Sequence, residues 1–156
     1  MDPAPIELDA TDRRLLALLQ DDCALTNDEL ARRAHVSPAT SLRRVRRLVE
    51  AGVIERRIAI VAATAAGGVT AIVEVTLAQQ TAEELDRFEA HVAAAAEVQQ
   101  CYRVASGPDF VLVVYVPDAA AYHAFAHRVL TAQANVRNVR SFFAVKRSKF
   151  EPKVPL

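Results

Sequence analysis

Four arginines lie within residues 43–47, in the stretch S-P-A-T-S-L-R-R-V-R-R-L that spans residues 37–48. A guanidinium group is planar and always charged, and it can donate paired hydrogen bonds to phosphate oxygens or to O6 and N7 of guanine. Residues 37–60 hold six arginines and two glutamates, a local excess of four positive charges. Because the whole chain has 19 basic and 19 acidic residues and no net charge, this excess predicts an electrostatic function confined to one stretch.

Three predicted helices would position these arginines. Each begins at a residue whose side chain can accept a hydrogen bond from a free first-turn N–H. Asp12 places a negative charge in the first turn of the first helix, where the helix dipole favours it. A short helix, a tight turn and a longer basic helix ending at Gly52 are the parts of a helix-turn-helix motif. The three caps are Asp9, Thr26, which has Glu29 at the spacing of a capping box, and Ser37, which precedes Pro38 at a position that needs no N–H donor.

The third helix is predicted to have a buried side and a DNA-facing side. Leu42, Val45, Leu48 and Val49 recur at three- and four-residue spacing and are expected to pack on the first two helices. The opposite side has small residues at its N-terminal end, where a large side chain would block close approach. The residues predicted to contact DNA are Ser37, Pro38, Ala39, Thr40, Arg43, Arg44, Arg46 and Arg47.

Two alternatives stay open for the basic residues. Arginine is a good helix former, so the arginine side of the helix could be a solvated surface with no ligand. The following stretch V-I-E-R-R-I-A-I could be a strand in which Arg56 and Arg57 touch flanking phosphates, or a surface pair on an edge strand. We include Arg57 among the predicted DNA contacts.

The second part of the chain predicts an α+β fold. Strand-like and helical patterns alternate in the order β-α-β-β-α-β, which describes the ferredoxin-like sandwich, two helices on one face of a four-stranded antiparallel sheet. We expect a helix-turn-helix domain over residues 1–57, a connecting strand over 58–67 and the sandwich over 68–156. The predicted elements of the sandwich are Val69–Ala78, Ala82–Ala94, Val98–Ala105, Phe110–Val116, Ala119–Leu130 and Val139–Lys146.

The predicted strands are too apolar for a sheet that has one face exposed to solvent. Segments such as A-I-V-E-V-T-L and F-V-L-V-V-Y-V place apolar side chains on both faces. We expect the same sheet of a second copy to cover the outer face, related by a two-fold axis. Such a dimer would present two basic helices to half-sites roughly 34–36 Å apart on DNA.

A turn between the central strands, V-A-S-G-P-D-F-V-L, predicts a second site. Exposed amides at Ser106 and Gly107 could bind the carboxylate of an amino acid, with Asp109 beside its ammonium and Tyr102 and Phe110 nearby. Alternatively this is an ordinary hairpin turn in which Asp109 bonds only its own backbone.

Three stretches in order resemble one family: L-D-A-T-D-R-R-L-L-A-L-L-Q-D-D, L-A-R-R-A-H-V-S-P-A-T-S-L-R-R-V-R-R-L-V-E-A-G-V-I and S-G-P-D-F-V-L-V-V-Y-V-P-D. They resemble the Lrp/AsnC transcription regulators over residues 8–148. The resemblance implies a recognition helix at Ser37–Glu50, an effector loop at Ser106–Phe110, double-stranded DNA and a small amino acid as ligands, and dimers that assemble into tetramers or octamers. The loop departs from the family pattern: it is one residue shorter and keeps one acidic group.

Other functions are weighed against this one. Haem-pathway decarboxylases resemble the same family, and a metabolite-binding module without DNA binding would keep the sandwich. His123 and His127 have a spacing that can bind a metal, but no further ligand lies close in sequence. We therefore expect no enzyme activity, cofactor or metal.

The two cysteines, Cys23 and Cys101, are too few for a disulfide framework and are expected to pack in the core of a protein from a reducing compartment. No apolar run approaches the roughly 18 residues of a membrane span, and the N-terminus has no signal-peptide pattern. These features predict a cytoplasmic location.

Overall fold

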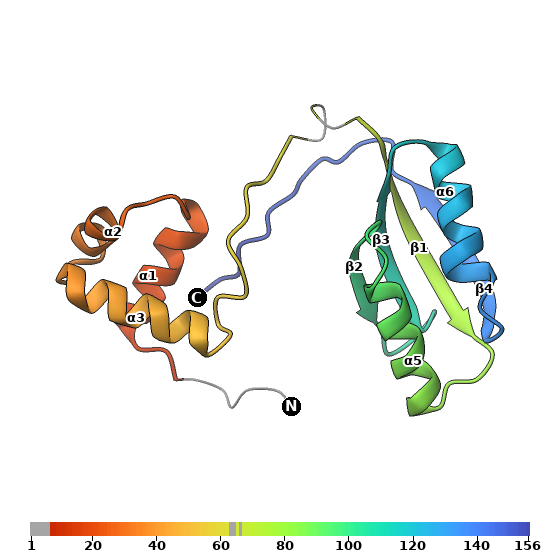
Figure 1. The fold of residues 1–156 in the computed structure, drawn as a ribbon, viewed down its shortest axis with the longest axis horizontal. Helices are drawn as coiled ribbons and strands as arrows, with labels where there is room; N and C mark the ends of the chain where they lie inside the picture. Colours follow the sequence, from red (N-terminus) through yellow and green to blue (C-terminus); the bar gives the residue numbers. More distant parts are fainter. Residues whose placement is uncertain (1–6, 63–64, 66) are drawn as a thin grey trace. The chain divides into compact units, whose positions relative to one another are not determined.

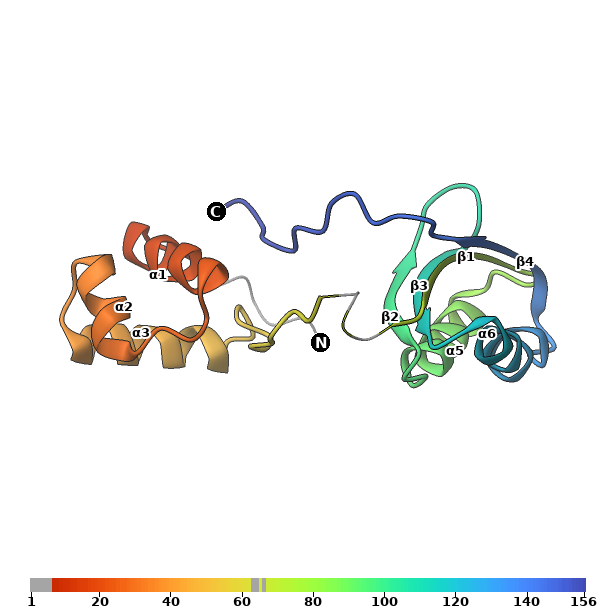
Figure 2. The ribbon, with the colours of Figure 1, turned by 90° about the horizontal axis from the view of Figure 1, so that it is seen from above.

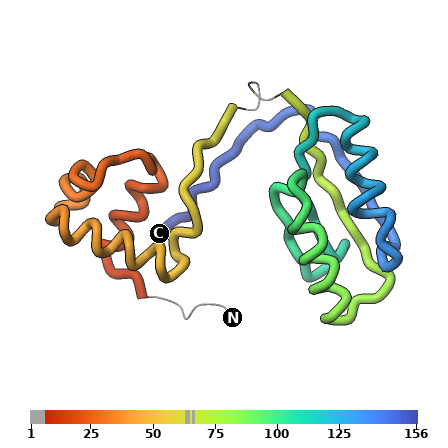
Figure 3. The backbone as a smooth tube through the Cα atoms, in the orientation of Figure 1, coloured from red at the N-terminus to blue at the C-terminus, as the bar shows by residue number. Residues whose placement is uncertain are grey.

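The computed structural model describes residues 7–62, 65 and 67–156. The chain forms two compact units that divide between Ile60 and Val61, inside the predicted connector (Figure 1). Within its described residues the first unit is helical apart from its loops, and the second, which ends at Lys149, contains the sheet and the helices that cover it. The segment Phe150–Leu156 belongs to the helical unit, whereas the sequence placed it with residues 68–156. Figure 3 shows the carboxyl end of the chain beside the helices of that unit.

The helical unit forms because each helix has the N-terminal cap that the sequence predicts. The side chains of Asp9, Thr26 and Ser37 accept hydrogen bonds from first-turn N–H groups. His35 adopts a left-handed conformation with φ of 57° and ends the second helix, so the chain turns directly into the third. The helices are α1 (Ala10–Asp21), α2 (Asn27–Ala34) and α3 (Pro38–Glu50).

The buried side of α3 is narrower than predicted. Val45 and Leu48 pack inward as expected, and Ser41 completes the buried stripe. Leu42 and Val49 were predicted to pack, but their exposed fractions are 52% and 48%, so this prediction was wrong. In the described residues α1 and α2 pack against α3, and the small Ser41 is fully buried. Leu42 and Val49 therefore lie on the flank of the helix.

The second unit is the ferredoxin-like sandwich. All strand pairs are antiparallel, in the order β2-β3-β1-β4, and both long helices cover one face of the sheet (Figure 2). This confirms the predicted α+β class. The elements are β1 (Val69–Leu77), α5 (Ala82–Ala93), β2 (Val98–Arg103), β3 (Phe110–Val116), α6 (Ala119–Phe125), a π-helical turn (Ala126–Thr131) and β4 (Val136–Phe143).

Two predicted strands differ from the structure by more than two residues, while β1 and β2 end one and two residues earlier than predicted. The last strand begins and ends three residues earlier than predicted, because Val136 pairs with Leu77 across an irregularity in the register. Polar side chains at 137 and 138 are exposed on this edge strand, so they do not prevent pairing. The stretch 53–62 contains no strand, because in this single chain its backbone has no neighbouring strand to pair with.

The two faces of the sheet differ in burial. The face under α5 and α6 is fully packed, with Val73, Val75, Phe110, Leu112 and Val114 all at zero exposure. Alternate residues point to the opposite face, which no helix covers. That open face has partly buried apolar residues at its centre and exposed aromatic residues on the outer strands: Ile72, Val111 and Val113, then Tyr102 and Phe142.

Candidate nucleic-acid interface

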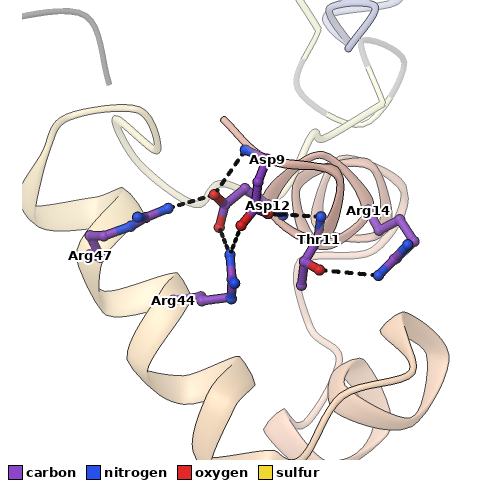
Figure 4. Close-up of polar contacts among 6 residues, drawn as sticks. All are labelled: Asp9, Thr11, Asp12, Arg14, Arg44 and Arg47. Atoms are coloured by element: carbon purple, nitrogen blue, oxygen red, sulfur yellow. Dashed lines mark hydrogen bonds and ion pairs between the residues drawn. The ribbon is translucent and has the colours of Figure 1, made fainter. Parts of the chain in front are cut away.

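A buried carboxylate joins α1 to the arginine helix. The Asp12 side chain is 1% exposed and accepts hydrogen bonds from Arg44 at 2.9 Å and from Arg47 at 2.5 Å (Figure 4). Arg44 also binds Asp9 at 2.7 Å. A buried carboxylate is stable only when opposite charges and hydrogen bonds compensate it. The two arginines therefore lock α3 onto the start of α1.

Local structure at the start of α1 orients both carboxylates. Asp9 and Asp12 form a reciprocal capping box, in which each side chain accepts a hydrogen bond from the other residue's backbone N–H. The Asp12 backbone N–H and the Arg44 guanidinium hold the pKa of Asp9 at about 2, below its ordinary 3.8. The same hydrogen bonds, first from Asp9 and then from Asp12, raise the pKa of Arg44.

These contacts predict an acid-sensitive helical unit. The folded-state pKa of Asp9 is lowered, so the unfolded state binds more protons. Its stabilising contribution is present above about pH 4 and is lost as the pH falls towards about 2. The melting temperature of Asp9→Asn should therefore depend less on pH than that of the wild type in this window. Melting curves measured by circular dichroism at pH 5, 4, 3 and 2 check this.

Asp28→Asn is the matched control for that experiment, because Asp28 is exposed in the first turn of α2. The melting temperature of Asp28→Asn should depend on pH as that of the wild type does, since this variant keeps Asp9 and its contacts. Equal slopes for Asp9→Asn and the wild type would show that the Asp9 contacts do not stabilise the fold.

Two arginines predicted to contact DNA also form contacts within the helical unit. Arg44 was predicted to face water, but its side chain is only 21% exposed and is shared between two carboxylates. Arg47 is 46% exposed but also binds Asp12. Both arginines therefore hold the helix in place, which the sequence prediction missed. The available signal was the spacing: Asp9 and Asp12 are three apart, as are Arg44 and Arg47, so each pair shares one face of its helix.

Two arginines remain available on α3. Arg43 and Arg46 are exposed, and within the described residues neither makes an ion pair or hydrogen bond. Ala39 lies four residues before Arg43 on the same exposed side, and Thr40 is partly buried beside it. The Ser37 hydroxyl donates to Thr40 Oγ1 at 2.9 Å. The N-terminal half of α3 thus presents small residues beside two free cations.

The other predicted DNA contacts lie at the margins of this surface. Ser37 and Pro38 are exposed at the first turn of α3, with the Ser37 hydroxyl serving as the cap. Arg57 and Arg56 are exposed in the irregular stretch after α3. The fold therefore holds Arg43 and Arg46 on a rigid helix and Arg57 on an extended segment.

The Asp109 side chain joins the turn Ser106–Phe110 to the end of β1. The Asp109 carboxylate accepts the Leu77 backbone N–H at 2.7 Å and the Gln80 side chain at 3.2 Å. It is therefore not held by its own backbone alone. Phe110 is fully buried, 4.9 Å from the Phe88 ring centroid, so it belongs to the core of the sandwich.

The remaining members of the predicted effector site are accessible. Ser106 and Gly107 are exposed, and Gly107 has φ of 90°, which a side chain would strain. Tyr102 is 53% exposed on β2, and its hydroxyl donates to Gln100. The structure therefore leaves the backbone around Ser106 and Gly107 free to contact a ligand.

Metal and membrane features were also considered. His123 and His127 are both exposed, the first on α6 and the second in the π-helical turn. Among the described residues no group of three or more histidine, cysteine or acidic side chains could hold a metal ion. Across that same part of the chain, every helix is too short or too polar to cross a membrane.

Comparisons with known proteins match both units. Residues 70–154 match the model of the Lrp/AsnC ligand binding domain, and residues 8–55 match that of the winged helix-turn-helix DNA-binding domain. The chain belongs to the Lrp/AsnC family. The leucine-responsive regulatory protein of Rhizobium meliloti is 38% identical over 145 residues, which cover 92% of this chain and 93% of the relative.

Solved structures of other Lrp/AsnC-like regulators have the same fold. An AsnC family transcriptional regulator from Agrobacterium tumefaciens is 36% identical, with a TM-score of 0.84, and the match covers 95% of this chain and 97% of that one. A transcriptional regulator from Neisseria meningitidis, solved as a complex with L-Met, is 29% identical with a TM-score of 0.84, and the match covers 96% and 97%. The chain is thus a helix-turn-helix transcriptional regulator of the Lrp/AsnC family.

Proposed function

We propose that this regulator binds two half-sites of an operator as a symmetric dimer, inserting α3 of each copy into the major groove, and that an amino acid controls it. The observation that carries the proposal is that the four arginines of α3 fall into two pairs with different contacts. Arg44 and Arg47 are bound to α1, while Arg43 and Arg46 project without a partner among the described residues. If the arginines only kept the surface solvated, there would be no reason for Arg44 and Arg47 to hold the helix in place while Arg43 and Arg46 stay unpaired beside them.

The exposed side of α3 can read bases as well as phosphates. Arg43 and Arg46 can each donate paired hydrogen bonds to guanine, and Ala39 leaves room for close approach. Leu42, on the adjacent flank, is 52% exposed and offers an apolar contact to a thymine methyl group. We infer half-sites in which guanine lies next to thymine, with Ser37, Pro38, Thr40 and Arg57 at the flanking backbone.

The open face of the sheet supplies the dimer contact in this proposal. Ile72, Val111 and Val113 form an apolar centre on neighbouring strands, the pattern expected for a surface that a second copy covers. Glu74 and Arg140 pair at 3.2 Å on the same face, so the polar residues there do not leave an unpaired charge. A stable interface of this kind buries about 800 Å² from each copy.

Selection of binding sites from random duplex DNA tests the function. The wild-type protein should enrich two-fold related half-sites whose centres lie about 10 base pairs, or a multiple of one helical turn, apart. Each half-site should contain guanine next to thymine, for the contacts inferred above. Enrichment of no sequence would contradict operator recognition.

Val113→Asp tests whether the open face of the sheet forms the interface of the symmetric dimer. An unpaired carboxylate in the interface costs several kcal/mol, so the dimer dissociation constant should rise at least about 100-fold. Sedimentation measures the oligomeric state, and this variant should enrich single half-sites only. Ala90→Asp, on the exposed side of α5, is the control and should remain dimeric. A dimeric Val113→Asp protein would place the contact elsewhere.

The effector site is proposed at the turn after β2. The exposed backbone at Ser106 and Gly107 binds the amino-acid carboxylate, and the exposed Tyr102 lies on β2, the strand that precedes this turn. Asp109 shapes the turn through Leu77 and remains close enough in sequence to face the ammonium group. The L-Met complex of the Neisseria meningitidis regulator supports an amino acid as ligand. In this proposal the protein senses and binds, and it catalyses no reaction on its ligand.

A thermal-shift screen of the twenty amino acids tests the effector. A ligand at 100 times its dissociation constant stabilises the protein by about 2.7 kcal/mol, which raises the melting temperature by several degrees. Gly107→Val should abolish that shift, because a branched side chain strains the positive φ. Ala105→Val places the same final side chain at an exposed neighbouring position and should keep the shift. A uniformly silent screen would remove the effector proposal and leave DNA binding standing.

A further inference from the structure

The carboxyl-terminal segment Phe150–Leu156 binds the end of α1. The Lys153 ammonium contacts the Asp21 carboxylate at 2.6 Å. The Gln20 side chain bonds the Val154 backbone twice: it accepts the Val154 N–H at 2.7 Å and donates to the Val154 carbonyl at 3.1 Å. A side-chain amide that satisfies both groups of one residue resembles the pairing of neighbouring strands. This segment therefore has a specific position on the helical unit.

Apolar side chains lie beside these polar contacts. The segment and the stretch after α3 line one groove of the helical unit, and Pro152, Val154 and Leu156 are the segment's apolar members. The other residues that line the groove include the aliphatic Leu16, Leu19, Val53, Ile54, Ile58 and Ile60 and the charged Asp21, Asp22, Glu55, Arg56 and Arg57. Lys153 of the segment lies at the acidic end of α1, and the segment's apolar residues line the same groove as the aliphatic ones.

The position of this segment changes how the two units are connected. The chain passes from the helical unit to the sheet unit between Ile60 and Val61, and it returns between Lys149 and Phe150. The returning connection leaves β4 at Phe143, so it starts in the sheet itself. Two connections restrict the motion of a domain more than one does, because the second contact is intramolecular.

We propose that Phe150–Leu156 is a releasable second tether, which restrains the DNA-binding unit and thereby strengthens binding to paired half-sites. The role rests on the proposed function, since only a protein that must place two helices on one duplex gains from such restraint. Restraint lowers the entropy lost when the second helix binds. Lys153 and Asp21 have side-chain exposures of 43% and 65%, so solvent and salt weaken their pairing and the tether can detach.

Charge reversal tests the docking in the full-length protein. Lys153→Glu places a third carboxylate beside Asp21 and Asp22 and should release the segment. Amide hydrogen exchange at Val154 should then accelerate at least about tenfold relative to the wild type, since its N–H loses its acceptor. The swapped pair Asp21→Lys/Lys153→Glu should restore the wild-type rate. Lys149→Glu changes the net charge equally at an exposed position and should leave exchange unchanged.

DNA binding tests the consequence of docking. On a duplex with two half-sites, Lys153→Glu should bind about tenfold more weakly than the wild type, and the swapped pair should bind like the wild type. On a single half-site all three proteins should agree within about twofold, because restraint matters only for the second contact. Lys149→Glu corrects for the general effect of charge on DNA affinity. Gln20→Ala should repeat the result without any change of charge.

The outcomes separate this inference from the proposed function. An unprotected Val154 amide in the wild type would overturn the docked segment. Protection that Lys153→Glu removes, together with unchanged affinity for two half-sites, would overturn the tether. Failure of the wild type to bind any duplex would overturn the proposed function, and with it the tether, while hydrogen exchange would still report the docking.

Discussion

Replacing Arg43 and Arg46 together with alanine should weaken binding to a single half-site about 100-fold at low salt, with no loss of stability. Each arginine contributes about 1–3 kcal/mol when it binds a guanine or a phosphate, and two contacts of about 1.4 kcal/mol each give this factor. The slope of log affinity against log salt should fall by about 2, since about 0.9 counterions are released per phosphate neutralised. Fluorescence anisotropy with labelled duplex, measured over a range of salt concentrations, gives both quantities.

The control for this prediction changes the same net charge elsewhere. Arg87→Ala/Arg137→Ala removes two exposed arginines from the sheet unit and should leave the salt slope unchanged. Operator binding by Arg43→Ala/Arg46→Ala with wild-type affinity and salt slope would show that α3 does not enter the groove. The stability of each variant is measured in parallel, because a partly unfolded protein would also bind weakly.

Replacing Asp12 with alanine should lower the free energy of unfolding of the helical unit by about 3 kcal/mol. The Asp12 side chain is 1% exposed and binds two guanidinium groups, so its removal takes the carboxylate from Arg47 and leaves Arg44 with Asp9 alone. The capping box is lost as well. Hydrogen exchange in peptides from α1 and α3 should accelerate about 100-fold, while peptides from the sheet unit should exchange at the wild-type rate.

A double-mutant cycle assigns this effect to the ion pair. The losses for Asp12→Ala and Arg44→Ala should not add, and the coupling between them should be about 2 kcal/mol. Asp28→Ala is the matched control, an exposed carboxylate in the first turn of α2, and should cost less than about 1 kcal/mol. Additive losses would mean that the hydrogen bonds to Arg44 contribute nothing and that the effect of Asp12 comes from the cap and from Arg47.

The two predictions depend on residues that look alike in the sequence. Arg43, Arg44, Arg46 and Arg47 form one basic stretch with no local sign of different roles. In the structure, alternate members contact α1 or solvent, because a helix turns by about 100° per residue. Mutating Arg44 is therefore expected to reduce stability, and mutating Arg43 to reduce DNA affinity.

Features that depend on near neighbours could be predicted from the amino-acid sequence. The caps at Asp9, Thr26 and Ser37 specified where the helices begin, and the alternation of apolar residues specified the order of elements in the sandwich. Both signals arise from backbone geometry over a few residues, so they can be read without knowing the rest of the fold.

Contacts between residues far apart in the chain became visible only in the three-dimensional fold. In the structure Arg44 and Arg47 bind Asp12, the Asp109 carboxylate accepts the Leu77 N–H, and Lys153 pairs with Asp21. The fold also leaves Leu42 and Val49 exposed, since burial of a helix face depends on which neighbours cover it. Each of these contacts joins residues at least 30 positions apart, and because their meeting depends on how whole elements pack, local spacing does not identify the partner.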